Sequence, residues 1–231
     1  MNSISDNIQR CREKMAVSAE KTGRRLEDIT LVAVSKTVPP ARINEAIGAG
    51  IRIIGENKVQ EAQQKFDEVD EVNWHMVGHL QTNKVKYALK IFDLIQSVDT
   101  YHLAEEINKR AEKDGKKVPI LIEVNTSGEE SKYGCNPEEA EDLVLRVSQL
   151  PSVEVKGLMT IGLFSDNPAL VRTCFVKLRR IFDSLSGQNI PNVKMEIISM
   201  GMSADFDLAI EEGSNMVRIG TAIFGPRRYE N

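Results

Sequence analysis

The sequence predicts an α/β fold: a single (β/α)₈ barrel, or TIM barrel, with an extra helix at its N-terminus. Short apolar runs alternate with amphipathic segments eight times along the chain, and such runs are typical of parallel strands buried on both faces. The chain has 231 residues, within the roughly 200–250 residues of a one-domain barrel. No linker, internal repeat or low-complexity stretch is visible, so one domain is expected over residues 1–231.

The N-terminal segment is predicted to be a helix that precedes the first strand. Apolar side chains recur at spacings of three and four over residues 3–22, and a glycine follows as a stop. Residues 30–37 then form an apolar, β-branched run that stops at Lys36, and Pro39 and Pro40 prevent its continuation. Lys36 is therefore expected at the carboxyl end of a buried strand.

The remaining elements are expected to follow as strand and helix in alternation. Each strand is a short apolar or alternating segment, and each helix has apolar residues at helical spacing. The strands are expected at residues 52–56, 72–77, 92–97, 118–124, 153–159, 194–199 and 215–219. The helices are expected at residues 41–47, 57–66, 82–90, 101–113, 137–150, 168–185 and 204–212. Residues 125–136 form a long polar loop that is expected to lie over the barrel mouth.

Composition and charge exclude several classes of function. The net charge is −4 and basic residues are scattered among acidic ones, so nucleic acid is not expected as a partner. No run approaches the roughly 18 apolar residues of a membrane helix, and the polar N-terminus shows no secretory signal. The cysteines Cys11, Cys135 and Cys174 are odd in number and far apart. They indicate neither a disulfide framework nor a metal site, and a cytoplasmic location is expected.

Lys36 is the residue to which we assign the chemistry. In open α/β sheets and in (β/α)₈ barrels, ligands bind at the carboxyl ends of the strands. Partial burial of a lysine disfavours its ammonium form and exposes the amine lone pair for Schiff-base chemistry. The alternative is a solvated lysine at a strand end, and this stretch alone does not decide between the two.

Two loops near the C-terminus have the composition of a phosphate site. In barrels, phosphate groups often bind between the loops after strands seven and eight. The first loop begins at Ser199 and contains Gly201, which allows close backbone approach, and Ser203, which offers a hydroxyl and an N-cap for the next helix. The second loop contains Gly220 and Thr221, whose backbone N–H groups can face the same anion. A plain helix cap and a plain turn glycine are the alternatives.

A strand-end lysine opposite a two-loop phosphate site meets the requirements of pyridoxal 5′-phosphate (PLP). The aldehyde would meet Lys36 while the phosphate meets the loops. Arg218 would donate to the pyridine nitrogen, and since arginine keeps its proton, the ring would be a weaker electron sink. Asn57, expected to begin a helix with Gln60 as capping-box partner, could bind the phenolic oxygen. A structural salt bridge for Arg218 and a helix N-cap for Asn57 are the alternatives.

Several longer motifs occur in an order that resembles a known family. They are Ala33-Val34-Ser35-Lys36-Thr37, Gly55-Glu56-Asn57 with Val59-Gln60-Glu61, Trp74-His75 through Gly78 to Leu80-Gln81 with Asn83-Lys84, Gly157-Leu158-Met159, Ser199-Met200-Gly201-Met202-Ser203 and Val217 to Gly225. Together they are similar to the pyridoxal phosphate homeostasis protein family (YggS/PROSC-like) over essentially the whole chain. The resemblance implies a fold-type III PLP-binding barrel like the N-terminal domain of alanine racemase, with Lys36 in the internal aldimine.

The resemblance also implies a cytosolic protein that buffers or delivers PLP and influences amino-acid and keto-acid pools. The competing interpretation is an enzyme, a PLP-dependent amino-acid racemase or decarboxylase on the same barrel. Racemases of this kind carry a second, β-rich domain that supplies a catalytic tyrosine across a dimer interface. This sequence ends soon after its eighth strand, and neither Tyr133 nor Tyr229 is obviously placed as a second acid–base group. We therefore expect a monomeric carrier with a solvent-reachable aldimine and apo PLP enzymes as recipients.

Overall fold

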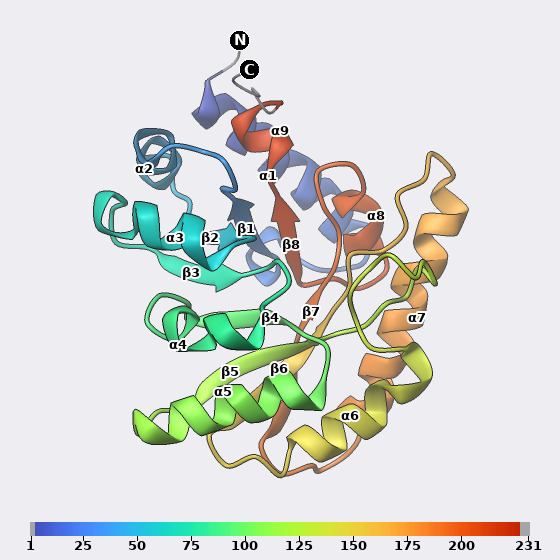
Figure 1. Cartoon of the computed structure of the whole chain (residues 1–231). Coiled ribbons are helices and arrows are strands. Elements are labelled where there is room, and N and C mark those ends of the chain that lie inside the picture. Colours follow the sequence, from blue (N-terminus) through green and yellow to red (C-terminus); the bar gives the residue numbers. More distant parts are fainter. Residues whose placement is uncertain (1–2, 227–231) are drawn as a thin grey trace.

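A closed barrel of eight parallel strands forms the centre of the protein (Figure 1). The computed structural model describes residues 3–226. The strands follow one another around the barrel in chain order, and β8 pairs with β1 to close it. They are β1 (Thr30–Val34), β2 (Ile53–Glu56), β3 (Asn73–Met76), β4 (Leu94–Val98), β5 (Val118–Glu123), β6 (Val153–Met159), β7 (Val193–Ser199) and β8 (Met216–Ile219). The predicted (β/α)₈ class, with its eight strands in order, is confirmed.

Helices surround the barrel and separate the strands along the chain (Figure 1). The α-helices are α1 (Ile4–Glu20), α2 (Pro40–Gly48), α3 (Val59–Lys65), α4 (Val85–Ala88), α5 (Tyr101–Lys113), α6 (Ala140–Val147), α7 (Pro168–Ser186), α8 (Phe206–Glu211) and α9 (Thr221–Phe224). Short 3₁₀ turns are η1 (Leu26–Asp28), η2 (Phe66–Glu68), η3 (Thr82–Lys84) and η4 (Pro137–Glu139). The helix expected over 82–90 is only the η3 turn followed by the single-turn α4, and α9 was not anticipated from the sequence.

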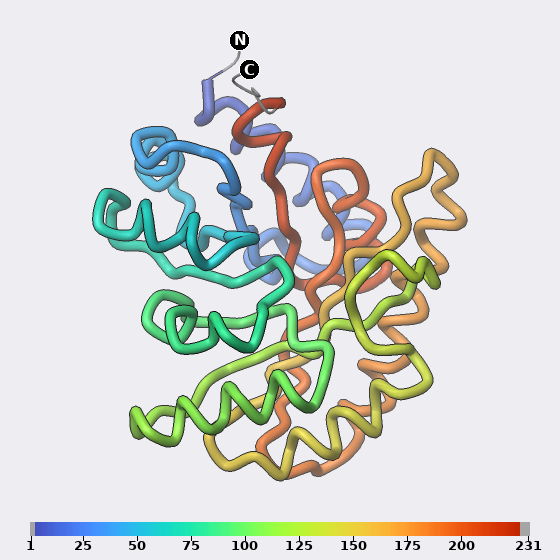
Figure 2. Tube along the Cα trace, in the orientation of Figure 1, coloured from blue at the N-terminus to red at the C-terminus, as the bar shows by residue number. Residues whose placement is uncertain are grey.

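The predicted N-terminal helix is present as α1, and it holds the C-terminal part of the barrel in place. Its first turn is closed by a capping box, in which the Ser3 Oγ accepts from the Asp6 N–H at 3.0 Å and the Asp6 Oδ2 accepts from the Ser3 N–H at 3.2 Å. The apolar face of α1 packs on α8 and α9, and Figure 2 shows the trace of α1 beside that of α9. Asn7 also donates to the Ile223 carbonyl of α9 at 2.7 Å. This contact fixes the short helix that follows β8.

Side chains inside the barrel form an apolar layer with a polar layer beyond it. Alternate residues of a strand point to the same face. On β4, β5 and β8, an inward apolar residue (Leu94, Leu121, Met216) is followed two positions later by an inward polar residue (Gln96, Glu123, Arg218), which lies nearer the carboxyl end of the strand. The apolar layer contains Val32, Val77, Leu94, Leu121, Met159 and Met216. The buried polar layer contains Gln96, Glu123, Ser199 and Arg218. The interior therefore becomes polar at the carboxyl ends of the strands, which we call the mouth. Within residues 3–226, no helix has the length and apolar character that spanning a membrane requires.

Candidate functional site

Lys36 lies in a turn at the mouth, directly beyond β1. The strand expected over residues 30–37 ends at Val34, so Lys36 is on the turn rather than on the strand itself. The Ser35 N–H still donates to the Gly55 carbonyl of β2 at 2.9 Å, and Pro40 begins α2. The Lys36 side chain is half-buried. The proline-limited turn therefore presents the lysine at the end where barrels bind their ligands.

The loop after β7 is held close to β8 by a glycine. Gly201 has φ +93°, a conformation that side chains rarely adopt. A Cβ at this position would lie 2.5 Å from the Ala209 Cβ and 2.9 Å from the Phe206 Cα. The Gly201 carbonyl accepts from the Arg218 N–H at 3.0 Å. The predicted need for glycine thus has a steric cause, namely close packing of the loop on α8.

Ser203 joins the two predicted phosphate loops. Its Oγ accepts from the N–H of Gly220 at 3.2 Å and from the N–H of Ala222 at 3.3 Å. The prediction that Ser203 caps the next helix was wrong: α8 begins at Phe206, with Asp205 as its N-cap. The Asp205 Oδ1 accepts from the Met202 N–H at 2.6 Å, and this tight turn delays the helix. The Ser203 hydroxyl is therefore released to bridge to the loop after β8.

The second loop sits against the end of β1. A Cβ at Gly220 would lie 3.2 Å from the carbonyl oxygen of Val34, which is only two residues before Lys36. Thr221 is exposed and begins α9. The structure thus brings Lys36, Ser203, Gly220 and Thr221 to one side of the mouth, where β8, β1 and the loop after β7 meet.

Arg218 is fixed inside the barrel by neutral groups. Its Nη1 donates to the Ser199 Oγ at 2.6 Å and its Nη2 donates to the Thr160 carbonyl at 2.7 Å. The salt-bridge alternative is not borne out among residues 3–226, because both of these hydrogen-bond partners are uncharged. Burial lowers the pKa of Arg218 to about 10, while the charges of Glu123 and Asp205 oppose the shift. The guanidinium therefore stays protonated at neutral pH.

A chain of hydrogen bonds continues from Arg218 to the other side of the barrel. The Ser199 Oγ donates to the Gln96 Oε1 at 2.7 Å, and the Gln96 Nε2 lies 2.9 Å from the His75 Nδ1. Since the Gln96 oxygen is the acceptor from Ser199, its NH₂ group donates to His75. Burial lowers the pKa of His75 to about 4, so the imidazole is neutral and accepts this bond. Sequence analysis did not single out Gln96, and it named His75 only within a motif, without a role.

A buried carboxyl group faces Arg218 from the end of β5. Glu123 is 2% exposed. Burial raises its pKa to about 7, the Asp99 charge adds to the rise, and the Arg218 charge opposes it. The nearby thiol of Cys135 has its pKa raised to about 12, mainly by burial and also by Asp99, so it is not a nucleophile at neutral pH. Sequence analysis missed Glu123, although its position two residues after Leu121 places it on the inner face.

Asn57 lies at the mouth but does not cap a helix. Helix α3 begins at Val59 with Lys58 as its N-cap and without a side-chain cap hydrogen bond, so the predicted capping box with Gln60 is wrong. Asn57 is half-buried just after β2. The loop after β3 packs on its backbone, since a Cβ at Gly78 would lie 2.5 Å from the Asn57 carbonyl oxygen. The role of Asn57 toward a cofactor oxygen stays a prediction.

The long loop over residues 125–136 contacts two other loops at the mouth through its side chains. The Tyr133 ring stacks on the His79 ring, after β3, with centroids 3.8 Å apart and an interplanar angle of 11°. The Lys132 Nζ donates to the Gly162 carbonyl, after β6, at 2.7 Å. The loop therefore lies at the mouth, as its position after β5 led us to expect. Tyr229 lies outside the described residues.

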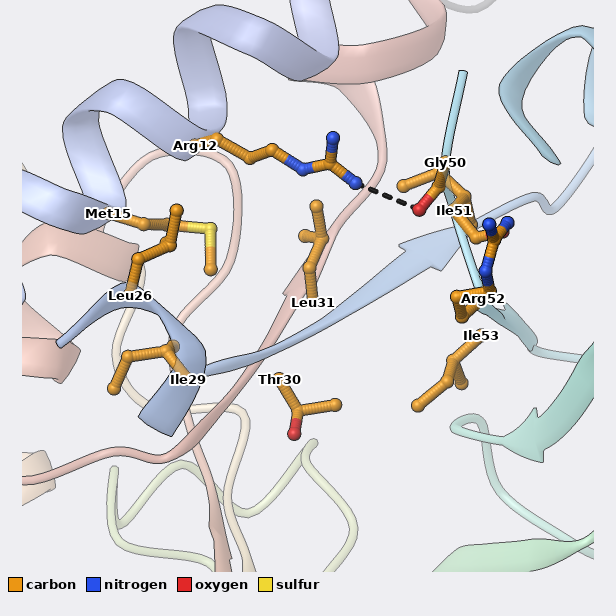
Figure 3. A pocket seen from close by; sticks show the side chains of 10 residues that line it. All are labelled: Arg12, Met15, Leu26, Ile29, Thr30, Leu31, Gly50, Ile51, Arg52 and Ile53. Atoms are coloured by element: carbon orange, nitrogen blue, oxygen red, sulfur yellow. Dashed lines mark hydrogen bonds between the residues drawn. The ribbon is translucent and has the colours of Figure 1, made fainter. Parts of the chain in front are cut away.

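A pocket of about 200 Å³ lies at the opposite end of the barrel (Figure 3). It is lined by the first residues of β1 and β2, including Thr30 and Ile53, and by Met15 of α1. Arg12 reaches across it and donates to the Gly50 carbonyl at 2.8 Å. Because barrel active sites are built at the carboxyl ends of the strands, this pocket is not the candidate site. Within residues 3–226, no cluster of His, Cys, Asp and Glu side chains could hold a metal ion.

Fold and site together define a class: barrel proteins that present a lysine after β1 beside joined loops after β7 and β8. The family model of the alanine racemase N-terminal domain matches residues 3–228. The pyridoxal phosphate homeostasis protein of Aquifex aeolicus is 45% identical over 226 residues, which cover 97% of this chain and 98% of that protein. The chain belongs to the pyridoxal phosphate homeostasis protein family.

Two solved structures resemble the chain closely. A protein of unknown function from Bifidobacterium adolescentis has a TM-score of 0.92 and 38% identity, and the likeness covers 96% of this chain and 94% of that one. PipY of Synechococcus elongatus PCC7942, solved with PLP bound, has a TM-score of 0.82 and 33% identity, with 96% of this chain and 100% of PipY covered. The likeness to PipY extends over the whole barrel.

Proposed function

We propose that this protein binds PLP as a Schiff base with Lys36 and acts in intracellular PLP homeostasis and amino-acid and keto-acid balance. The observation that carries the proposal is the position of Gly220. A Cβ added there would lie 3.2 Å from the Val34 carbonyl oxygen, and the Gly220 N–H donates to the Ser203 Oγ. An anion held by these loops would lie beside the turn that carries Lys36. The family membership and the PLP-bound structure of PipY support this assignment.

Each proposed ligand has a separate task. Lys36 would hold the aldehyde end of PLP, and the cofactor would supply imine chemistry there. The hydroxyl of Ser203 accepts two N–H bonds and, among residues 3–226, donates to no acceptor, so its proton suits a phosphate oxygen. The Gly220 N–H, which was expected to face the anion, donates to Ser203 instead. We propose that the Thr221 N–H and the backbone at Gly201 complete the contacts to that anion. These features fit a cofactor that carries both an aldehyde and a phosphate.

Ser199 and Arg218 would control the pyridine side of the cofactor. The guanidinium is held in one plane by Ser199 and by the Thr160 carbonyl. A protonated arginine that donates to the ring nitrogen keeps that nitrogen unprotonated, so stabilisation of negative charge on a bound amino acid is weak. Asn57 is proposed to bind the phenolic oxygen. This arrangement favours holding the cofactor over converting substrates.

We propose a carrier rather than a racemase or decarboxylase. Tyr133 is 55% exposed and its ring stacks on His79, so we propose that it holds the loop over residues 125–136 rather than transferring a proton. We also propose a monomer with a solvent-reachable imine, because Lys36 is only half-buried and Thr221 beside it is exposed. Apo PLP enzymes are the proposed recipients, and the three dispersed free cysteines support a cytoplasmic location.

Two measurements test this function. Purified protein incubated with PLP should show a visible imine band, and Lys36→Ala should lack it while keeping a normal melting temperature. Incubation with a panel of L-amino acids in deuterated water should show only slow α-proton exchange. A full imine band in Lys36→Ala would refute the lysine assignment. Exchange at ordinary enzymatic rates would instead favour the racemase or decarboxylase alternative.

A further inference from the structure

We propose that Glu61 and Lys65 of α3 are positioning residues for Lys36, acting through the two residues that flank it. This inference rests on the proposed function of Lys36. Neither α3 side chain needs to touch the cofactor in this role. They hold the backbone on both sides of the lysine, together with Glu56 at the end of β2.

The residue before the lysine is held by a buried ion pair. The Lys65 Nζ donates to the Ser35 carbonyl at 2.9 Å and to the Glu56 Oε1 at 2.7 Å. The Ser35 Oγ donates to the same Glu56 oxygen at 2.7 Å. Ser35 and Glu56 are 0% exposed and Lys65 is 9% exposed. Charge-assisted bonds in such an environment are short and strongly directional, so the Ser35 peptide has little freedom.

The residue after the lysine is held in an unusual conformation. Thr37 has φ +62°, in the left-handed region that a β-branched residue rarely adopts. Its N–H donates to the Glu61 Oε2 at 3.2 Å. Backbone strain of this kind persists only where the surroundings impose it, and it concentrates at functional sites. Helix α3 therefore contacts the turn on both sides of Lys36, through Lys65 on one side and Glu61 on the other.

Stability alone does not account for this arrangement. A buried ion pair recovers its desolvation cost only when all of its lone pairs are satisfied. The Glu56 Oε2 is buried and has no hydrogen-bond partner, so this pair falls short of that condition. An apolar pair of similar volume would cover the strands equally well. An apolar pair would not form the hydrogen bond from Lys65 to the Ser35 carbonyl. This bond fixes the peptide that precedes Lys36, and so the direction in which the Lys36 side chain leaves the backbone.

Positioning matters because a lysine side chain has four rotatable bonds. A fixed backbone restricts the positions that its amine reaches, and a displacement of about 1 Å can cost orders of magnitude in reactivity. Removing Lys65 or Glu61 should therefore slow imine formation and weaken PLP binding, while the barrel stays folded. The Thr37 amide should also exchange faster with solvent, because its acceptor or its rigid support is gone.

The test uses Lys65→Met and Glu61→Leu, with Lys113→Met and Glu105→Leu on α5 as matched controls, since both control side chains are exposed. In cofactor-free protein, hydrogen exchange of a peptide that contains Thr37 should accelerate at least tenfold in the α3 variants only. The rate at which acetic anhydride modifies Lys36 should change as well. With PLP added, the dissociation constant of the α3 variants should rise about tenfold. This effect is similar in size to the loss of one hydrogen bond to a charged group.

The outcomes separate this inference from the proposed function. If the native protein forms no imine band, the proposed function fails, while the exchange and acetylation readouts still test the positioning role. If the native protein forms the band and both α3 variants match the controls in exchange, Lys36 modification and PLP affinity, the positioning role is refuted. It is also refuted if exchange rises over the whole chain and the melting temperature falls in parallel, since that result indicates a purely structural role. Glu61→Leu, which removes the acceptor of the Thr37 N–H, alone decides the matter if Lys65→Met does not fold.

Discussion

Replacing Ser203 with alanine is expected to weaken PLP binding by about tenfold to a hundredfold. The hydroxyl is the side-chain donor that we assign to the phosphate, and a hydrogen bond to a charged group contributes about 1.5–3 kcal/mol. The same oxygen accepts from the N–H groups of Gly220 and Ala222. Their loss should cost about 1–3 kcal/mol of folding free energy, at about 0.5–1.5 kcal/mol for each bond. For a chain of this size, the melting temperature should then fall by roughly 2–4 °C per kcal/mol.

The assay for Ser203→Ala is a PLP titration followed by visible absorbance, with a thermal melt of the cofactor-free protein alongside. Ser186→Ala is the matched control, because the Ser186 hydroxyl donates to the Phe182 carbonyl within an exposed helix end. The control should leave the dissociation constant unchanged. An unchanged dissociation constant in Ser203→Ala would place the phosphate elsewhere, even if the variant melts at a lower temperature.

Three further predictions concern the buried Glu123, the loop that carries Tyr133, and the oligomeric state. The folded pKa of Glu123 is about 7 against an ordinary value of 4.5, so the folded state binds more protons between these values and loses stability as pH rises through them, by about 3 kcal/mol at most. Urea unfolding at pH 5 and pH 8 should show this loss of stability in the native protein and a much smaller loss in Glu123→Gln. An equal loss in the two proteins would contradict the raised pKa of Glu123. Tyr133→Ala should let hydroxylamine strip PLP several times faster, since the loop loses its stacking on His79, whereas Tyr87→Ala, which alters an exposed residue, should not. Light scattering should give a mass near the 25.8 kDa of one chain, and a stable dimer would overturn the monomer proposal.

The fold was predictable because strand and helix periodicities were locally strong. Runs such as residues 30–34 and 118–123 are mainly apolar, and parallel sheets covered by helices bury both faces of such strands. Eight strands alternating with helices in a chain of this length favour the closed barrel. Element ends were less predictable. Helix starts at Asn57 and at residue 204 were inferred from local capping rules, but the structure begins these helices two residues later. At α8, the Asp205 side chain closes a turn on the Met202 N–H, so the helix begins after Asp205 and Ser203 does not cap it.

The candidate site was predictable where the proposed role of a residue depends only on its own loop. Lys36, Gly201 and the Gly220 loop were identified from strand-end position and glycine placement. Arg218 and Ser199 were also predicted as cofactor-binding residues. Their hydrogen-bond network with Gln96 and His75 was not predicted, because its members are far apart in the sequence and meet only when the barrel closes. The polar residues Gln96 and Glu123 follow apolar residues by two positions. That spacing is the signal that could have placed them on the inner face.

The most direct test of the central claim is to locate the covalent attachment of the cofactor. The protein is incubated with PLP, reduced with borohydride, digested and mapped by mass spectrometry. The account predicts one reduced pyridoxyl group per chain, on the peptide that contains Lys36, with an adduct on Lys65 or Lys132 at most a minor product. A major adduct on another lysine, or an equal yield in Lys36→Ala, would contradict it.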